Sequence, residues 1–257
     1  MTMAEKPNNP EYKPNQPLRR FFQFLARNII NLLTNLEIEG RENLPKSGPL
    51  IMVGNHFSFI DPVAFITLAP WPLEFIGGAF TPHAPKIVRF LPKLWGYLPV
   101  YRGTGSQYAL KQAQKILKQG GVLGIFPEGG SWAQVLRPAR PGAALLSAET
   151  GAPLLPIGLI GMSNVFPALK DFKRANIKIR IGKLFGPFKV SGSRYERRRQ
   201  LDSISEEIMQ RIAELLPAEL AGVYSSDLRI REEAEVFAKY PWEGLREGEN
   251  NDKYPIT

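Results

Sequence analysis

The sequence has 257 residues, of which 44% are hydrophobic and 22% are charged, so we expect one large globular domain with tails and not a disordered or fibrous chain. The chain has no cysteine and only two histidines, His56 and His83. This composition excludes disulfides, zinc-thiolate sites and a cysteine nucleophile, and it leaves few side chains that could bind a metal.

The formal net charge of +9 is concentrated in one part of the chain, because residues 173–199 hold ten Lys or Arg and a single acid, Glu196. A basic segment of this kind is attracted to anionic lipid and to nucleic acid through the same Coulomb interaction. The sequence lacks zinc-finger spacing, RNA-binding aromatic motifs and a helix-turn-helix signature. We therefore expect an anionic membrane surface as a partner and no nucleic acid.

The first two segments of the chain are expected to precede the main globular domain. Residues 1–17 carry four prolines among polar residues and predict a disordered leader. Residues 18–35 mix aromatic and aliphatic side chains with Arg19, Arg20 and Arg27, a pattern typical of an amphipathic helix. Such a helix could lie in lipid headgroups with its cationic face toward them, or it could pack on the protein's own core. No apolar run reaches the roughly 20 residues that span a bilayer.

Short apolar runs and helical patterns then alternate along the chain. We expect strands at residues 50–53, 73–76, 98–101, 122–126, 154–160 and 177–181, and helices at residues 62–68, 105–119, 142–150 and 193–216. This alternation predicts an α/β fold in which a mixed, largely parallel sheet is flanked by helices. We assign residues 36–222 to this domain and residues 223–257 to a polar C-terminal tail.

The first candidate for chemistry is the segment 55–61, which reads NHFSFID. His56 follows a predicted strand at the carboxyl edge of the sheet, where α/β proteins place ligands. Asp61 precedes Pro62, so its carboxylate could cap the next helix. It could instead fold back onto the imidazole of His56, orienting one ring nitrogen and leaving the other basic.

NHFSFID resembles the Asn-His-x4-Asp motif (HX4D) of the glycerolipid acyltransferase family, which includes the 1-acylglycerol-3-phosphate acyltransferases. Three further blocks follow in the family's order: VYRG at residues 100–103, FPEG at residues 126–129 and APLLP at residues 152–156. The resemblance extends from about Leu36 to Tyr224. It implies the glycerol-3-phosphate acyltransferase-like fold, a peripheral protein on the cytoplasmic face of a membrane, and no bound cofactor. It also implies a lysolipid acceptor and either acyl-CoA or acyl-carrier protein as the acyl donor.

The resemblance also implies roles for individual residues. His56 would be the catalytic base and Asp61 would orient it. The implied substrate-binding residues are Asn55, Arg102, Glu128, Gly129, Gly130, Arg140 and Pro156.

The sequence departs from the family after Gly129, where Thr, Arg and Ser commonly follow but Gly130, Ser131 and Trp132 stand here. Arg137 or Arg140 could replace the missing arginine. The departure leaves open another lysolipid acceptor, a lipid-binding protein without turnover, and a thioesterase-like hydrolase.

Overall fold

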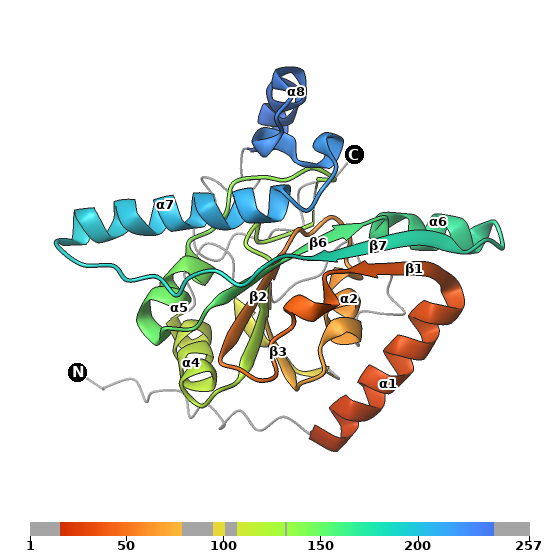
Figure 1. Ribbon diagram of the computed structural model, residues 1–257, viewed down its shortest axis with the longest axis horizontal. Coiled ribbons are helices and arrows are strands. Elements are labelled where there is room, and N and C mark those ends of the chain that lie inside the picture. Colours follow the sequence, from red (N-terminus) through yellow and green to blue (C-terminus); the bar gives the residue numbers. More distant parts are fainter. Residues whose placement is uncertain (1–15, 79–94, 101–106, 132, 239–257) are drawn as a thin grey trace, which may run out of the picture.

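A computed structural model describes residues 16–78, 95–100, 107–131 and 133–238 of the chain. Its centre is a sheet in which the described strands follow the order β1-β7-β6-β2-β5-β3-β4 (Figure 1). Every neighbouring pair is parallel except β6 and β7. The expected α/β fold with a mixed, largely parallel sheet is thus confirmed.

The strands carry short apolar runs whose alternate side chains pack on opposite faces of the sheet. In β2, Leu50 and Met52 join one core, whereas Ile51 and Val53 join the other. A strand buried on both faces has no polar positions, as expected at the centre of a parallel sheet. The strands are β1 (Thr34–Glu39), β2 (Leu50–Gly54), β3 (Leu73–Gly78), β4 (Leu98–Val100), β5 (Val122–Ile125), β6 (Leu154–Ile160) and β7 (Ala175–Ile181).

Helices cover both faces of the sheet. The core on one face takes side chains from α1 (Gln16–Leu33), α2 (Asp61–Leu68) and α6 (Val165–Lys170). The core on the other face takes side chains from α4 (Gln107–Lys118), α5 (Gly142–Thr150) and α7 (Arg194–Ala213). The chain continues through α8 (Leu228–Ala238). Short 3-10 turns are η1 (Arg41–Asn43), η3 (Met162–Asn164), η4 (Ala218–Leu220) and η5 (Gly222–Tyr224).

The ends of the chain differ in detail from what the sequence predicts. The N-terminal helix ends at Leu33, and the residues that follow form the unpredicted edge strand β1. The predicted leader lies outside the described residues except for Gln16 and Pro17, which belong to α1. Within the predicted tail, η5 and α8 are described, and Ser225 and Ala234 are buried. The boundary of the tail at residue 223 therefore remains a prediction.

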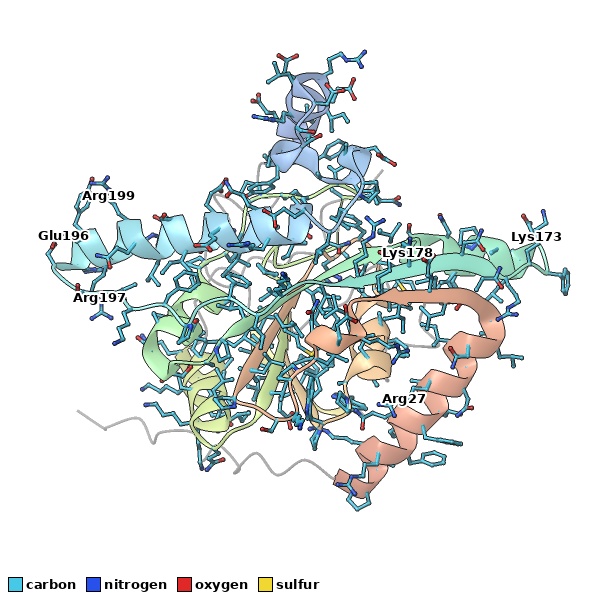
Figure 2. The ribbon with its side chains drawn as sticks, viewed as in Figure 1. Arg27, Lys173, Lys178, Glu196, Arg197 and Arg199 are labelled. Atoms are coloured by element: carbon cyan, nitrogen blue, oxygen red, sulfur yellow. The ribbon has the colours of Figure 1, made fainter. Side chains whose placement is uncertain are left out.

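Two arginines of α1 are turned toward the protein, in line with the second of the two interpretations that the sequence left open. Arg19 is 2% exposed, forms an ion pair with the buried Glu74 and donates to the carbonyl of Trp95. Arg27 donates to the carbonyls of Thr67 and Ala69 at the end of α2. Figure 2 shows Arg27 on the side of α1 that faces the body of the molecule. Arg19 and Arg27 therefore attach the helix to the domain, whereas Arg20 is exposed.

The basic segment 173–199 does not form one patch. Lys173 lies at one end of the molecule, at the turn between α6 and β7, whereas Arg197 and Arg199 lie at the other end, on the first turns of α7 (Figure 2). Between them, Lys178 pairs with Glu37 and Glu39 on the neighbouring strand β1. The net charge is therefore divided among separate surfaces, and the expectation of a single basic patch is wrong.

Candidate active site

The candidate site lies where the central strands β2 and β5 end. These strands are parallel neighbours, with Val53 beside Ile125, so the loops that follow them leave the same edge of the sheet. Gly54 ends β2 at a place without room for a side chain, because a Cβ would lie 2.9 Å from both the carbonyl oxygen of Ile157 and the ring of Phe65. The glycine lets the chain leave the sheet close to its neighbours and begin the loop that carries His56.

Asp61 holds the imidazole of His56 and does not cap the helix that it begins. His56 Nδ1 lies 2.9 Å from Asp61 Oδ2. The same carboxylate oxygen accepts the backbone amides of Phe57 at 2.8 Å and Ser58 at 2.7 Å. Both amides precede α2, whose N-cap is Ile60 without a side-chain hydrogen bond. The carboxylate therefore points back into the loop, which decides between the two interpretations left open by the sequence.

The two partners differ in exposure. Asp61 is fully buried, and burial raises the pKa of its carboxyl group, whereas the hydrogen bonds from His56 and from the backbone act against that rise. The side chain of His56 is 17% exposed, and its ring stacks on Phe126 with centroids 4.4 Å apart. Because Nδ1 faces Asp61, Nε2 is the ring nitrogen left to meet a substrate, and no described residue hydrogen-bonds it. This arrangement suits a general base whose tautomer is fixed by a carboxylate.

Glu128 connects the loop after β5 to the loop after β2. Its Oε1 accepts the backbone amide of His56 at 2.7 Å, and its Oε2 accepts Arg137 Nε at 3.1 Å. The guanidinium of Arg137 also donates to the carbonyl of Gly130. Both charged side chains are buried, and burial raises the pKa of Glu128 to about 7, with the Arg137 charge acting in the opposite direction. Glu128 thus positions His56 through the backbone.

The structure distinguishes the two residues, Arg137 and Arg140, that could replace the arginine missing from the family motif. Of the two substitutes that the sequence offered, Arg137 is 1% exposed and holds Glu128 and Gly130. Arg140 is exposed, and its backbone amide donates to Pro127 at 2.8 Å. Arg140 is therefore the one of the two that solvent, and hence a soluble headgroup, can reach.

Two of the expected substrate-binding residues have structural partners instead. The Asn55 side chain is buried, donating to the carbonyl of Leu159 at 2.9 Å and accepting its amide at 2.7 Å, so it fixes the start of the loop to β6. Pro156 lies within β6 beside Val53, where it packs next to Gly182. The substrate-binding role expected of these two residues remains a prediction.

Of the remaining expected residues, the structure describes Gly129, Gly130 and Arg140 in the segment that follows β5. Gly129 follows β5 with φ of 76°, a left-handed conformation that glycine adopts without strain, and Gly130 follows it. Arg102 lies outside the described residues, shortly after β4, which is parallel to β3.

Sequence reasoning missed the contributions of Phe126 and Arg137. Phe126 lies in the FPEG block but stacks on the ring of His56, and its own support comes from Phe65, 4.8 Å away. Arg137 was considered only as a phosphate ligand. The apolar neighbour Leu136 is the one signal in the sequence that the charge of Arg137 would be buried and need a carboxylate. In the fold, Leu136 is fully buried.

Comparison with known proteins identifies the domain. A family model described as Acyltransferase matches residues 35–160, a stretch that contains both loops of the site. Residues 35–160 belong to this acyltransferase family. The match covers β1 to β6, so the acyltransferase domain includes the edge of the sheet at which His56, Asp61 and Glu128 lie.

Several relatives carry names that specify an activity. A chloroplastic 1-acyl-sn-glycerol-3-phosphate acyltransferase of Brassica napus is 31% identical over 157 residues, which are 58% of this chain and 45% of the relative. The 1-acyl-sn-glycerol-3-phosphate acyltransferase of Bacillus subtilis is 25% identical over 188 residues, 73% of this chain and 91% of the relative. This chain thus spans about half the length of the plant relative and most of the bacterial one.

Among solved structures, the 1-acyl-sn-glycerophosphate acyltransferase PlsC of Thermotoga maritima has a similar fold. The TM-score is 0.53 with 23% sequence identity, and the alignment covers 74% of this chain and 77% of that protein. At this identity the likeness concerns the fold of the acyltransferase domain.

Proposed function

We propose that the protein transfers a fatty acyl group from an acyl thioester to a hydroxyl of a lysophospholipid such as 1-acylglycerol-3-phosphate, in phospholipid synthesis. The observation that carries the proposal is the 2.9 Å contact between His56 Nδ1 and the buried carboxylate of Asp61 at the carboxyl edge of the sheet. Membership of the acyltransferase family and the names of the relatives support this reaction and this class of acceptor.

The reaction needs a base because a hydroxyl is a poor nucleophile at neutral pH. His56 Nε2 takes the hydroxyl proton while the oxygen attacks the thioester carbonyl, a contribution of about 10²- to 10⁴-fold in rate. Asp61 stabilises the imidazolium that forms. The tetrahedral intermediate then expels the thiol, whose pKa of roughly 8.5 lets it leave as thiolate and take a proton from the imidazolium. The ester is formed by direct transfer, and the donor is acyl-CoA or acyl-carrier protein.

We assign the acceptor's phosphate to the exposed cations and glycines around this edge. Gly129 is half-buried in a left-handed conformation, Arg140 is exposed, and Arg102 follows β4 in the sequence. A guanidinium matches the geometry of a phosphate through paired hydrogen bonds. Glu128 is excluded from direct acceptor binding in this proposal, because both of its oxygens accept from His56 and Arg137.

Because the residues after Gly129 depart from the family motif, the second candidate acceptor is a lysolipid without a terminal phosphate. Arg137 is committed to Glu128, so the loop offers fewer cations than the family motif. Purified protein, labelled acyl-CoA and a panel of acceptors separate the two. We expect 1-acylglycerol-3-phosphate to be the best acceptor; preference for a lysolipid without phosphate would overturn that choice and leave the chemistry intact.

His56→Ala tests the catalytic assignment. We expect acyl transfer to fall by about 10²-fold or more, because the base is lost. The melting temperature should change little, since the ring stacks at a partly exposed site. Full activity of the variant would contradict the assignment. Thiol release that needs no acceptor in the wild type would indicate a hydrolase, and vesicle binding without any turnover would indicate a lipid-binding protein.

We also propose that the protein works at a membrane surface through α1. The outward face of this helix carries Phe21, Phe24, Leu25, Ile29 and Leu32, which are 39–73% exposed. We call these five residues the apolar stripe. No helix among the described residues is long and apolar enough to cross a bilayer. A helix with an apolar face turned to solvent and with Arg19 and Arg27 turned to the protein suits insertion of that face into the headgroup and acyl boundary.

A further inference from the structure

The turn between α6 and β7 carries an exposed phenylalanine at a position that normally takes glycine. Phe172 is 100% exposed, and its φ of 55° is the only positive value among the described non-glycine residues. The amide of Lys173 donates to Ala168 and that of Phe172 to Leu169, which is the hydrogen-bond pattern of a Schellman motif. In that motif Phe172 stands at the left-handed position just after the helix end.

Both properties of Phe172 are unfavourable for folding alone. A left-handed backbone costs free energy in any residue with a Cβ and is nearly free for glycine. An aromatic ring in water gains nothing from the hydrophobic effect. Because the ring has no contact surface within the domain, folding does not account for it. Burial of the ring against a partner accounts for it.

Charge and neighbours indicate which partner this is. Phe172 lies between Asp171 and Lys173, with Lys170 and Arg174 next along the chain, and these four charged residues are exposed. Three cations against one acid leave the turn with a positive charge. Arg174, next in the chain, donates to the carbonyls of Asn31 at 2.6 Å and Thr34, at the end of α1. The turn is thereby fixed to the end of the helix on which Leu32, 73% exposed, closes the apolar stripe. Figure 1 shows α1 and the turn after α6 on the same side of the molecule, with Lys173 at its extremity in Figure 2.

We propose that residues 170–174 form a second membrane contact beside the apolar stripe, with the Phe172 ring inserted at the bilayer interface and Lys170 and Lys173 on anionic headgroups. The inference rests on the membrane surface of the proposed function and names how the domain is oriented on it. Aromatic rings flanked by lysines are favoured at this depth of a bilayer.

The second contact has a consequence for the catalytic loop. Helix α6, which precedes the turn, presents Phe166, whose ring stacks on Phe59 with centroids 5.2 Å apart. Phe59 belongs to the loop between His56 and Asp61. One helix therefore connects the membrane contact to the loop that holds the base. Two contacts fix the tilt of the domain, which a single helix lying in the interface leaves free to rotate.

Phe172→Gly is the sharpest test, because it removes the ring and supplies the residue that the backbone favours. We expect its affinity for vesicles that contain phosphatidylglycerol to fall about tenfold, as for partial loss of a buried aromatic side chain. Its melting temperature should equal or exceed that of the wild type. Tyr195→Ser is the matched control, since Tyr195 is 71% exposed beside Arg194 and Arg199 at the other end of the molecule. That variant should bind as the wild type does.

The absence of cysteine allows a direct measurement of insertion. A polarity-sensitive fluorophore on Phe172→Cys should shift to the blue on vesicles and be quenched by brominated lipid, and the same label on Tyr195→Cys should not. Unchanged affinity of Phe172→Gly, or equal responses at the two positions, would overturn the second contact while wild-type vesicle binding stands. Failure of the wild type to bind vesicles would overturn both membrane proposals, whereas a fully active His56→Ala would overturn only the chemistry.

Discussion

Glu128 shows how a residue inside a recognisable motif can have a role that the motif does not reveal. The block FPEG marks it, but its partners come from elsewhere: the amide of His56 and the guanidinium of Arg137. A sequence gives no measure of which buried charges meet. The pairing depends on β2 and β5 being neighbours, which no local pattern specifies.

The raised pKa of Glu128 predicts a pH dependence of stability. Burial moves this pKa from 4.5 in the unfolded chain to about 7 in the fold. Between these values the folded state holds a proton that the unfolded state has lost, so the stability contributed by protonated Glu128 is full below pH 4.5 and declines as pH rises to about 7. The free energy of unfolding should fall over this window by up to about 3 kcal/mol on account of Glu128.

Urea denaturation of the wild type and Glu128→Gln at pH 5 and pH 7.5 measures this contribution. The variant mimics the protonated side chain, so its loss of stability across the window should be smaller by that amount. Glu219→Gln, at an exposed position, is the control and should keep the wild-type dependence. If the free energies of unfolding of the wild type and Glu128→Gln change equally with pH, the carboxyl group has the same pKa in the folded and unfolded states, and the prediction is wrong.

For Asp61, the sequence cannot decide between helix capping and a contact with His56. The pair Asp61 and Pro62 is a regular helix start, and helix capping was a sufficient explanation for it. The choice depends on the side-chain torsion, which places Oδ2 on His56, Phe57 and Ser58. Only the coordinates of the loop exclude capping.

Among the elements, α1 was predictable in kind but not in orientation. Its amphipathic pattern was read from the sequence, and the structure extends the helix from Gln16 to Leu33. Polar residues normally mark the solvent face, but the sequence left open whether the arginines meet lipid or the protein. In the fold they meet carbonyls at the ends of other elements, and Gln23 does the same with Ala69 and Trp71. Strand β1 escaped prediction because only alternate residues of it are covered.

Arg27→Ala tests the inward orientation of α1. Arg27 satisfies the carbonyls of Thr67 and Ala69, where the last turn of α2 lacks helical partners. Removing it should lower the free energy of unfolding by about 1–3 kcal/mol. Arg20→Ala, at an exposed position about two helix turns earlier, should change it by less than about 0.5 kcal/mol. Equal stabilities, measured by urea denaturation, together with weaker vesicle binding by Arg27→Ala, would return Arg27 to a lipid-facing role.

For the whole molecule, the α/β class and most strands were predictable because buried strands give compact apolar runs, as in residues 154–160, which match β6. The surface was less predictable. Residues 173–199 are continuous in sequence, but β7 and α7 carry them across the molecule, so their charge is divided (Figure 2). One side of the molecule is instead distinguished by the apolar stripe of α1, which is far from residues 173–199 in sequence.

The double variant Phe24→Ser/Leu32→Ser tests whether this side presents the site to lipid. Phe24 is 66% and Leu32 is 73% exposed, so neither change opens a cavity, and the melting temperature should stay within a few degrees of the wild type. Each side chain that leaves the bilayer interface weakens vesicle binding by about tenfold. The rate with a long-chain acceptor in vesicles should therefore fall, whereas the rate with a short-chain acceptor free in solution should not, because His56 and Asp61 are untouched. A matched pair at the exposed positions Arg20 and Asn28, changed to Ser, controls for polarity at the same helix. Equal losses with both acceptors would place the stripe in catalysis or folding and remove the membrane from its role.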